Sequence, residues 1–178
     1  MVTNLLKKYP ELLEIMHLNE ADRLVSLQRI FTRDIEENSN FNFRAKQIRP
    51  IKIDGKISMD TLFNHLITER IHDEETGTGH KKSVFEKDRA MRLHWIKEHV
   101  DESIEDKIEV FSLIERDQIQ RKDIPKTYLY NSKEKYVIVF EVQRSGLDYY
   151  LLSAHYLNRP GSEKGIKKKM KKKLDEVL

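Results

Sequence analysis

The sequence predicts an α+β protein in which N-terminal helices precede an antiparallel sheet of four or more strands. Three observations lead to this fold class. Apolar residues recur at steps of three or four in much of the first hundred residues, and then at every second position between residues 107 and 157. The turns between the β-rich runs are too short for parallel crossovers. A last amphipathic run follows Arg159-Pro160-Gly161. Because helices and strands are grouped separately along the chain, we expect an α+β architecture.

Residues 1–40 are expected to form an N-terminal helical arm. Pro10 interrupts a first apolar run, and Asn19 is well suited to cap a second helix. In that helix the apolar residues recur at helical spacing: Leu24, Leu27, Phe31 and Ile35. We expect this arm to pack on the rest of the molecule or to bind a protein partner.

Residues 41–160 are expected to form the main domain. Phe43–Ile53 has strand character, and Ser58 can cap a helix over Met59–Thr68. The clearest helix covers Glu86–Val100, where an apolar stripe runs along one side. This helix is predicted to pack on the apolar face of the sheet.

Four β-rich runs should form the sheet as an antiparallel meander, and they cover residues 107–116, 127–131, 136–143 and 147–157. Alternation makes the last run informative. Ser153 and His155 should share one face, and a second set should share the opposite, core-facing side: Tyr150, Leu152, Ala154 and Tyr156. This places a hydroxyl beside an imidazole, the natural proton carrier near neutral pH. A half-exposed histidine with no chemical role is the alternative.

Composition excludes several classes of protein. The 178 residues include no cysteine, so disulfide scaffolds, thiol nucleophiles and thiolate zinc sites are excluded. His94 and His99 are five residues apart, and no His-Glu-x-x-His motif occurs, so we expect neither a metal site nor a cofactor. No apolar run approaches a membrane span and no signal peptide is evident, so we expect a cytoplasmic protein that does not bind membranes.

The positive charge is concentrated at the end of the chain. Residues 163–178 contain seven lysines and three acidic residues, a net charge of +4, whereas the other residues include 26 basic and 27 acidic ones. Residues 161–178 are therefore predicted to be a basic helix. A solvated helix face is one interpretation and contact with a polyanion is the other. For the second, the candidate contacts are Lys167, Lys168, Lys171 and Lys172.

The order of motifs between residues 84 and 160 resembles the phage-associated nucleases of the barnase–EndoU–colicin–RelE superfamily. These motifs are Arg89-Ala90-Met91-Arg92-Leu93-His94-Trp95-Ile96, a strand ending at Arg116, Lys126-Thr127-Tyr128-Leu129, and Tyr149-Tyr150-Leu151-Leu152-Ser153-Ala154-His155-Tyr156-Leu157. Two positions depart from the family pattern. Ser153 stands where the family usually has Thr, and His155 stands where Tyr is common.

The resemblance implies a metal-independent endoribonuclease in which the ribose 2′-hydroxyl attacks its own phosphate. It implies RNA as the partner, a phage or prophage origin in a bacterial cytoplasm, a role as a toxin-like or host-takeover factor, and an antitoxin as a candidate partner for the N-terminal helices. The residue types that such a reaction needs are present. The catalytic candidates are His94, Arg116, Tyr128, Ser153 and His155, and the phosphate-binding candidates are Arg89, Arg92 and Lys126.

Two other functions fit the same sequence. A non-catalytic RNA-binding module would use the basic helix without cleaving RNA. An interaction protein would use the N-terminal helices to bind a partner and the sheet only as a scaffold. Cleavage of RNA without a metal ion would distinguish the endoribonuclease from both of these alternatives.

Overall fold

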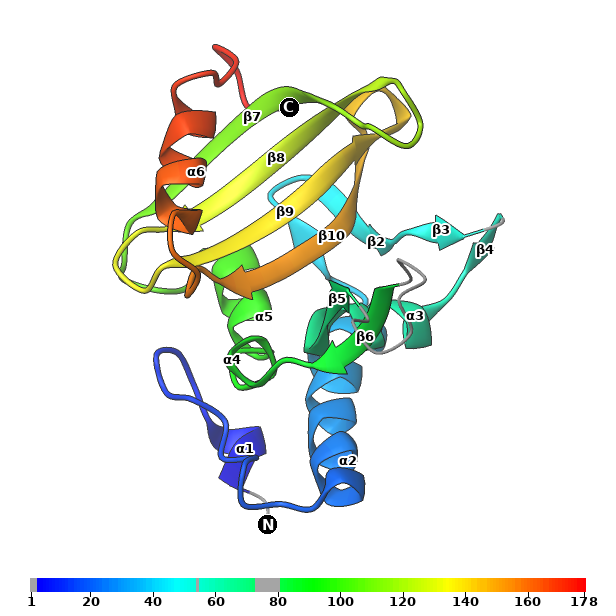
Figure 1. Ribbon diagram of the computed structural model, residues 1–178, viewed down its shortest axis with the longest axis vertical. Coiled ribbons are helices and arrows are strands. Elements are labelled where there is room, and N and C mark those ends of the chain that lie inside the picture. Colours follow the sequence, from blue (N-terminus) through cyan, green and yellow to red (C-terminus); the bar gives the residue numbers. More distant parts are fainter. Residues whose placement is uncertain (1–2, 54, 73–80) are drawn as a thin grey trace.

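The computed structural model describes residues 3–53, 55–72 and 81–178, and its architecture is α+β (Figure 1). Six strands form one mixed sheet in the order β1-β2-β10-β9-β8-β7. Their bounds are β1 Asn42–Phe43, β2 Lys46–Pro50, β7 Ile108–Arg116, β8 Asp123–Asn131, β9 Tyr136–Gln143 and β10 Asp148–Tyr156. The four predicted β-rich runs are thus neighbouring antiparallel strands, β7 to β10, which confirms the predicted meander.

The parallel strand beside the meander was not predicted. β2 pairs in parallel with β10, in a register that joins Ile48 to Tyr149 and Pro50 to Leu151. Two small hairpins lie outside the sheet. They are β3 Lys52–Ile53 with β4 Lys56–Ile57, and β5 Thr68–His72 with β6 Lys81–Phe85. The sheet is therefore mixed, with the predicted antiparallel part complete within it.

Each face of the sheet carries its own apolar cluster. The larger cluster joins β9 and β10 to helices α2 Glu20–Phe31, α3 Met59–Ile67, α4 Lys87–Ala90 and α5 Trp95–Val100. The smaller cluster lies on the opposite face, beneath helix α6 Ser162–Met170. In Figure 1, α6 lies against the β7 side of the sheet, while α1 to α4 gather in the lower part of the molecule. Because β2 pairs only with Asp148–Leu151, the outer edge of the rest of β10 is left for a cavity.

The helix predicted over Glu86–Val100 is wrong as a single element. The structure has two short helices, α4 and α5, joined by a turn at residues 91–94. The Met91 carbonyl explains the break, because it accepts a hydrogen bond from the Leu13 N–H at 3.0 Å. The Trp95 N–H bonds instead to the carbonyl of Arg92 at 2.9 Å. The N-terminal segment thus binds the carbonyl oxygen that would accept from the Trp95 N–H in a continuous helix. The two helices still pack on the sheet, as predicted.

The N-terminal residues share the main core. Helix α1 covers only Thr3–Leu6, and an irregular segment follows before α2. Leu13 and Ile15 in that segment are fully buried, as are Leu27 and Phe31 of α2. The Asn19 side chain caps α2 as expected, accepting from the Asp22 N–H at 2.9 Å. A π-helical turn over Thr32–Glu36 continues α2. None of the described helices combines the length and apolar content needed to cross a bilayer.

Candidate functional site

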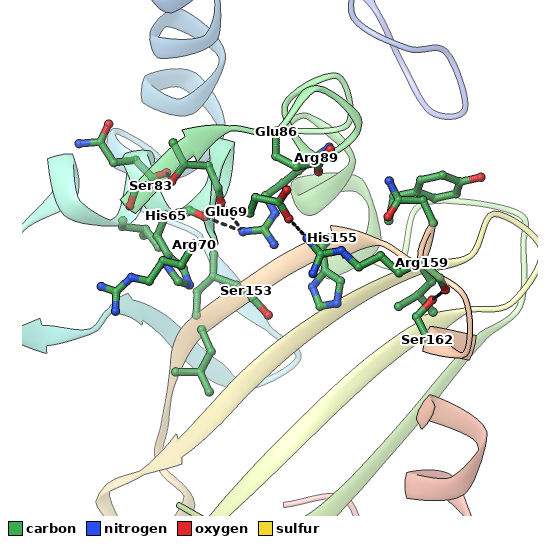
Figure 2. Close-up of a pocket in the computed structure, with 18 of the residues that line it drawn as sticks. His65, Glu69, Arg70, Ser83, Glu86, Arg89, Ser153, His155, Arg159 and Ser162 are labelled. Atoms are coloured by element: carbon green, nitrogen blue, oxygen red, sulfur yellow. Dashed lines mark hydrogen bonds and ion pairs between the residues drawn. The ribbon is translucent and has the colours of Figure 1, made fainter. Parts of the chain in front are cut away.

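A cavity of about 820 Å³ lies between β10, α3, α4 and the β5–β6 hairpin. Figure 2 shows the polar side chains at its wall, with Ser153 and His155 on β10, His65 and Arg70 toward one end, and Arg159 and Ser162 toward the other. Its volume is in the range of pockets that hold drug-sized ligands, roughly 300–1,000 Å³. Three of the residues proposed from the sequence line it: Arg89, Ser153 and His155.

A bulge in β10 shapes the cavity wall. The ladder with β9 pairs Leu151 with Phe140 and then Ser153 with Val139, so Leu152 has no partner in the ladder. The extra residue turns Leu152 to the face of the smaller apolar cluster, next to Ser153. The prediction that Tyr150 and Leu152 share the core face with Ala154 is therefore wrong. Tyr149 and Leu151 lie in the main core instead, whereas Ser153 and His155 share a face as predicted.

His155 is an uncharged imidazole in the free protein. Burial lowers the pKa of its ring to about 4, and the positive charges of Arg89 and Arg159 act in the same direction. Its Nδ1 atom is buried and has no hydrogen-bond partner among the residues that the structure describes. The hydrogen-bonding capacity of this nitrogen is thus left unused by the residues that the structure describes. Bound negative charge would offset the nearby arginines and favour protonation.

His65 is the second imidazole of the cavity, and the sequence reasoning did not identify it. It lies in the last turn of α3, and the backbone of Leu152 lies close enough to its ring to affect the pKa of His65. Burial lowers the pKa of His65 from its ordinary value, and Arg89 and Arg70 add to the shift. The bulge thus connects the two histidine-bearing elements, because its unpaired residue meets the ring of His65.

Arg89 and Arg159, two of the three arginines that line the cavity, place positive charge near His155. Arg89 of α4 donates from Nη1 to the carbonyl oxygens of His65 at 3.0 Å and Thr68 at 2.7 Å. Its Nε is buried without a partner among the described residues, and burial lowers the pKa of the guanidinium. Arg159, which follows β10, forms an ion pair with Glu69 of β5. Planar guanidinium groups of this kind suit phosphate oxygens.

The sequence contained a signal for His65, although not for Glu69 and Arg70, which lie on strand β5 of the same cavity wall. In α3 the apolar residues pack inward, whereas Thr61, Asn64 and His65 form a polar stripe at helical spacing, which Thr68 at the start of β5 continues. All four line the cavity. Glu69 and Arg70 lacked such a signal, because only the folded hairpin brings them to the end of β10, where Arg159 lies.

Tyr128 shares the sheet face of Ser153 but lies outside the cavity. The register places Tyr128, Val139 and Ser153 in one row across β8, β9 and β10, about 10 Å from first to last. The Tyr128 hydroxyl donates to Glu115 Oε2 at 2.7 Å and accepts from Lys169 Nζ at 2.9 Å. This contact joins α6 to the sheet.

Four other candidates also lie outside the cavity. Arg116 is exposed at the end of β7, where it pairs with Asp123 at 3.2 Å, and Lys126 pairs with Glu115 at 3.1 Å. His94 is 2 % exposed in the turn between α4 and α5. Arg92 is buried, with its guanidinium carbon 3.9 Å from the ring centre of Tyr156. The cavity therefore does not bring these four side chains together with His155.

The basic helix predicted over residues 161–178 is wrong in its extent, since α6 ends at Met170. The residues after it turn back onto the sheet, where the Leu174 N–H donates to the Ser112 carbonyl at 2.7 Å.

The lysines of this basic segment have two different environments. Lys169 faces the sheet, where it pairs with Glu115. The four lysines proposed as RNA contacts are exposed: Lys167, Lys168, Lys171 and Lys172. Because Ser162 at the start of α6 lines the cavity, Lys167 and Lys168 lie farther along the helix, and Lys171 and Lys172 follow its end.

A second, more open cavity of about 650 Å³ lies between α1 and α2. It is lined by Leu5, Val25, Gln28, Arg29, Thr32, Arg33 and Glu37. Val25 is 52 % exposed, and the neighbouring Leu6 is 74 % exposed. Binding of a protein partner by the N-terminal helices stays a prediction, and this surface is where it should be sought.

Within the described ranges, no group of three or more His, Asp or Glu side chains is arranged to hold a metal ion. Comparisons of the chain with protein-family models, with curated proteins and with solved structures found no match. The site is therefore judged on its own chemistry.

Proposed function

We propose that this protein is an endoribonuclease that cleaves RNA without a metal ion, and that it belongs with the phage-associated nucleases that its motifs resemble. One observation carries the proposal: His65 and His155 line the same cavity as Arg89 and Arg159. Two imidazoles and two guanidinium groups are the groups that intramolecular RNA cleavage requires.

The proposed reaction needs two proton transfers. One histidine removes the proton of the ribose 2′-hydroxyl, whose oxygen then attacks the adjacent phosphorus. The other histidine donates a proton to the departing 5′-oxygen as the phosphorus–oxygen bond breaks. Arg89 and Arg159 stabilise the negative charge on the non-bridging oxygens, and Ser153 is a further donor. DNA lacks the 2′-hydroxyl, so it should not be cleaved.

The test is incubation of the purified protein with single-stranded and structured RNA in the presence of EDTA. We expect cleavage with products that end in a 2′,3′-cyclic phosphate or its hydrolysis product. His65→Ala and His155→Ala should each lower the rate by about 10²- to 10⁴-fold. The matched control is His17→Ala, since His17 is exposed and lies outside the cavity.

Two outcomes would contradict the proposal. Strict dependence on Mg²⁺ would indicate a metal-assisted mechanism in place of the histidine pair. RNA that is bound by folded protein but stays intact would instead favour a non-catalytic RNA-binding module.

A further inference from the structure

The cavity is larger than phosphate binding requires. The histidines and arginines account for one part of its wall, whereas a second part is apolar and consists of Ile51, Leu62, Leu151 and Leu152. Leu62 and Leu151 are almost fully buried, so they form a fixed floor. A phosphate ion alone would leave most of the roughly 820 Å³ filled with water.

The bulge places the apolar wall directly beside the proposed reaction site. Leu152 is the unpaired residue of the bulge and precedes Ser153, and its backbone meets the ring of His65. A phosphate held by the cationic groups would therefore have a neighbouring group of the same ligand against Leu152. In RNA that neighbouring group is a ribose with its base, whose flat faces are apolar and whose edges are polar.

Asn64 is positioned to bind such an edge. It lies on the polar stripe of α3, one turn from Thr61 and next to His65. In the described part of the chain its side-chain amide has no hydrogen-bond partner, whereas the Thr61 hydroxyl donates to Ser58 Oγ at 2.9 Å. A carboxamide offers a donor and an acceptor side by side, which matches the edge of an unpaired base.

We propose that the apolar part of the cavity is a nucleobase subsite, in which Leu62 and Leu152 contact the face of one base and Asn64 binds its edge. This inference rests on the proposed function and adds to it, because the protein would then bind an unpaired nucleotide next to the bond it cleaves. A base drawn out of a duplex must first lose its stacking, so unpaired RNA is the preferred substrate.

The test separates the base from the phosphate. The four ribonucleoside 3′-monophosphates, ribose 5-phosphate and inorganic phosphate are each titrated into the protein by calorimetry. We expect at least one nucleotide to bind about fivefold or more tightly than ribose 5-phosphate. Asn64→Ala should reduce the differences among the four nucleotides and leave the affinity for inorganic phosphate unchanged.

Thr61→Val is the matched control, because the Thr61 hydroxyl already has a partner within the helix cap. It should keep the differences among the nucleotides. If ribose 5-phosphate binds as tightly as every nucleotide, the subsite is wrong while the phosphate site stands. If none of the six compounds binds to folded protein, the proposed function fails together with the subsite.

Discussion

His65 and His155 determine how cleavage should depend on pH. Catalysis needs one neutral and one protonated ring, whereas His155 has a pKa of about 4 and that of His65 is below its ordinary value. The pair therefore carries a single proton only at acidic pH in the free protein. We expect kcat/KM, measured with a dinucleotide, to peak below pH 6.5 and to fall at higher pH. A maximum at pH 7.5 or above, in protein shown to be folded by circular dichroism, would contradict this assignment.

At the scale of single residues, the sequence allowed part of the site to be predicted. Alternation along β10 correctly placed Ser153 and His155 on one face. It failed for Leu152, because the extra residue of the bulge reverses the faces of the residues that precede it in β10. The pattern of apolar residues contains no sign of such a bulge. His94 was misleading for a different reason. It belongs to the same arginine-rich motif as Arg89, yet the turn between α4 and α5 buries it outside the cavity.

At the scale of elements, the ion pair between Glu69 and Arg159 fastens the β5–β6 hairpin to the end of β10. In the free protein the Glu69 carboxylate is paired with the Arg159 guanidinium, which we propose as a phosphate-binding group. Glu69→Gln should therefore tighten the binding of a short RNA, by up to about fivefold, because an exposed pair of this kind contributes up to about 1 kcal/mol. Fluorescence anisotropy with a labelled oligonucleotide measures the change.

The control for this variant is Glu102→Gln, which removes a comparable exposed pair between Glu102 and Arg44 at 3.1 Å. It should leave the affinity for RNA unchanged. Equal affinities for the Glu69→Gln variant and the unaltered protein would show that Glu69 does not compete with the ligand.

Helix α6 should supply affinity without taking part in the chemistry. Its apolar side, Ile166 and Met170, covers the smaller cluster, so deleting the helix would expose core residues. Changing Lys167, Lys168, Lys171 and Lys172 to Gln removes four exposed charges and keeps this packing. We expect the slope of log K against log salt to flatten by about 2 to 3 units for single-stranded RNA.

Cleavage of a dinucleotide by this fourfold variant is the internal control, since so short a substrate cannot reach along α6 from the cavity. Its rate should be unchanged. An unaltered salt slope would mean that these lysines form only a solvated face of the helix. Lys169 is left in place because its bond to Tyr128 joins α6 to the sheet.

At the scale of the whole molecule, local patterns predicted the meander but could not predict the pairing of strands that are far apart in the sequence. Short turns between alternating runs leave few ways to connect β7 to β10. The parallel pairing of β2 with β10 joins residues about a hundred positions apart, and no pattern in either strand specifies it. The cavity could not be predicted for the same reason, because its wall combines α3, the β5–β6 hairpin and β10, which are far apart in the sequence.

Buried histidines should make the whole protein sensitive to acid. His94 and His99 are 2 % and 0 % exposed, and burial lowers the pKa of each ring to about 4. In the unfolded chain the same rings titrate near 6.5, so the unfolded state binds more protons between these two values. The free energy of unfolding must therefore fall as the pH drops from about 6.5 toward 4, by up to about 3 kcal/mol for each ring.

His94→Leu isolates one share of this effect, because neither ring nitrogen of His94 has a hydrogen-bond partner among the described residues. At pH 7 the variant should match or slightly exceed the stability of the unaltered protein, since it replaces a buried unsatisfied polar ring. At pH 4.5 it should be more stable by about 2 kcal/mol. Urea denaturation at both pH values measures the difference, with His17→Leu as the exposed control. Carboxylates that also titrate in this range are the same in every variant, so the comparison cancels them. A stability difference that is equal at the two pH values would show that His94 is not held neutral by its burial.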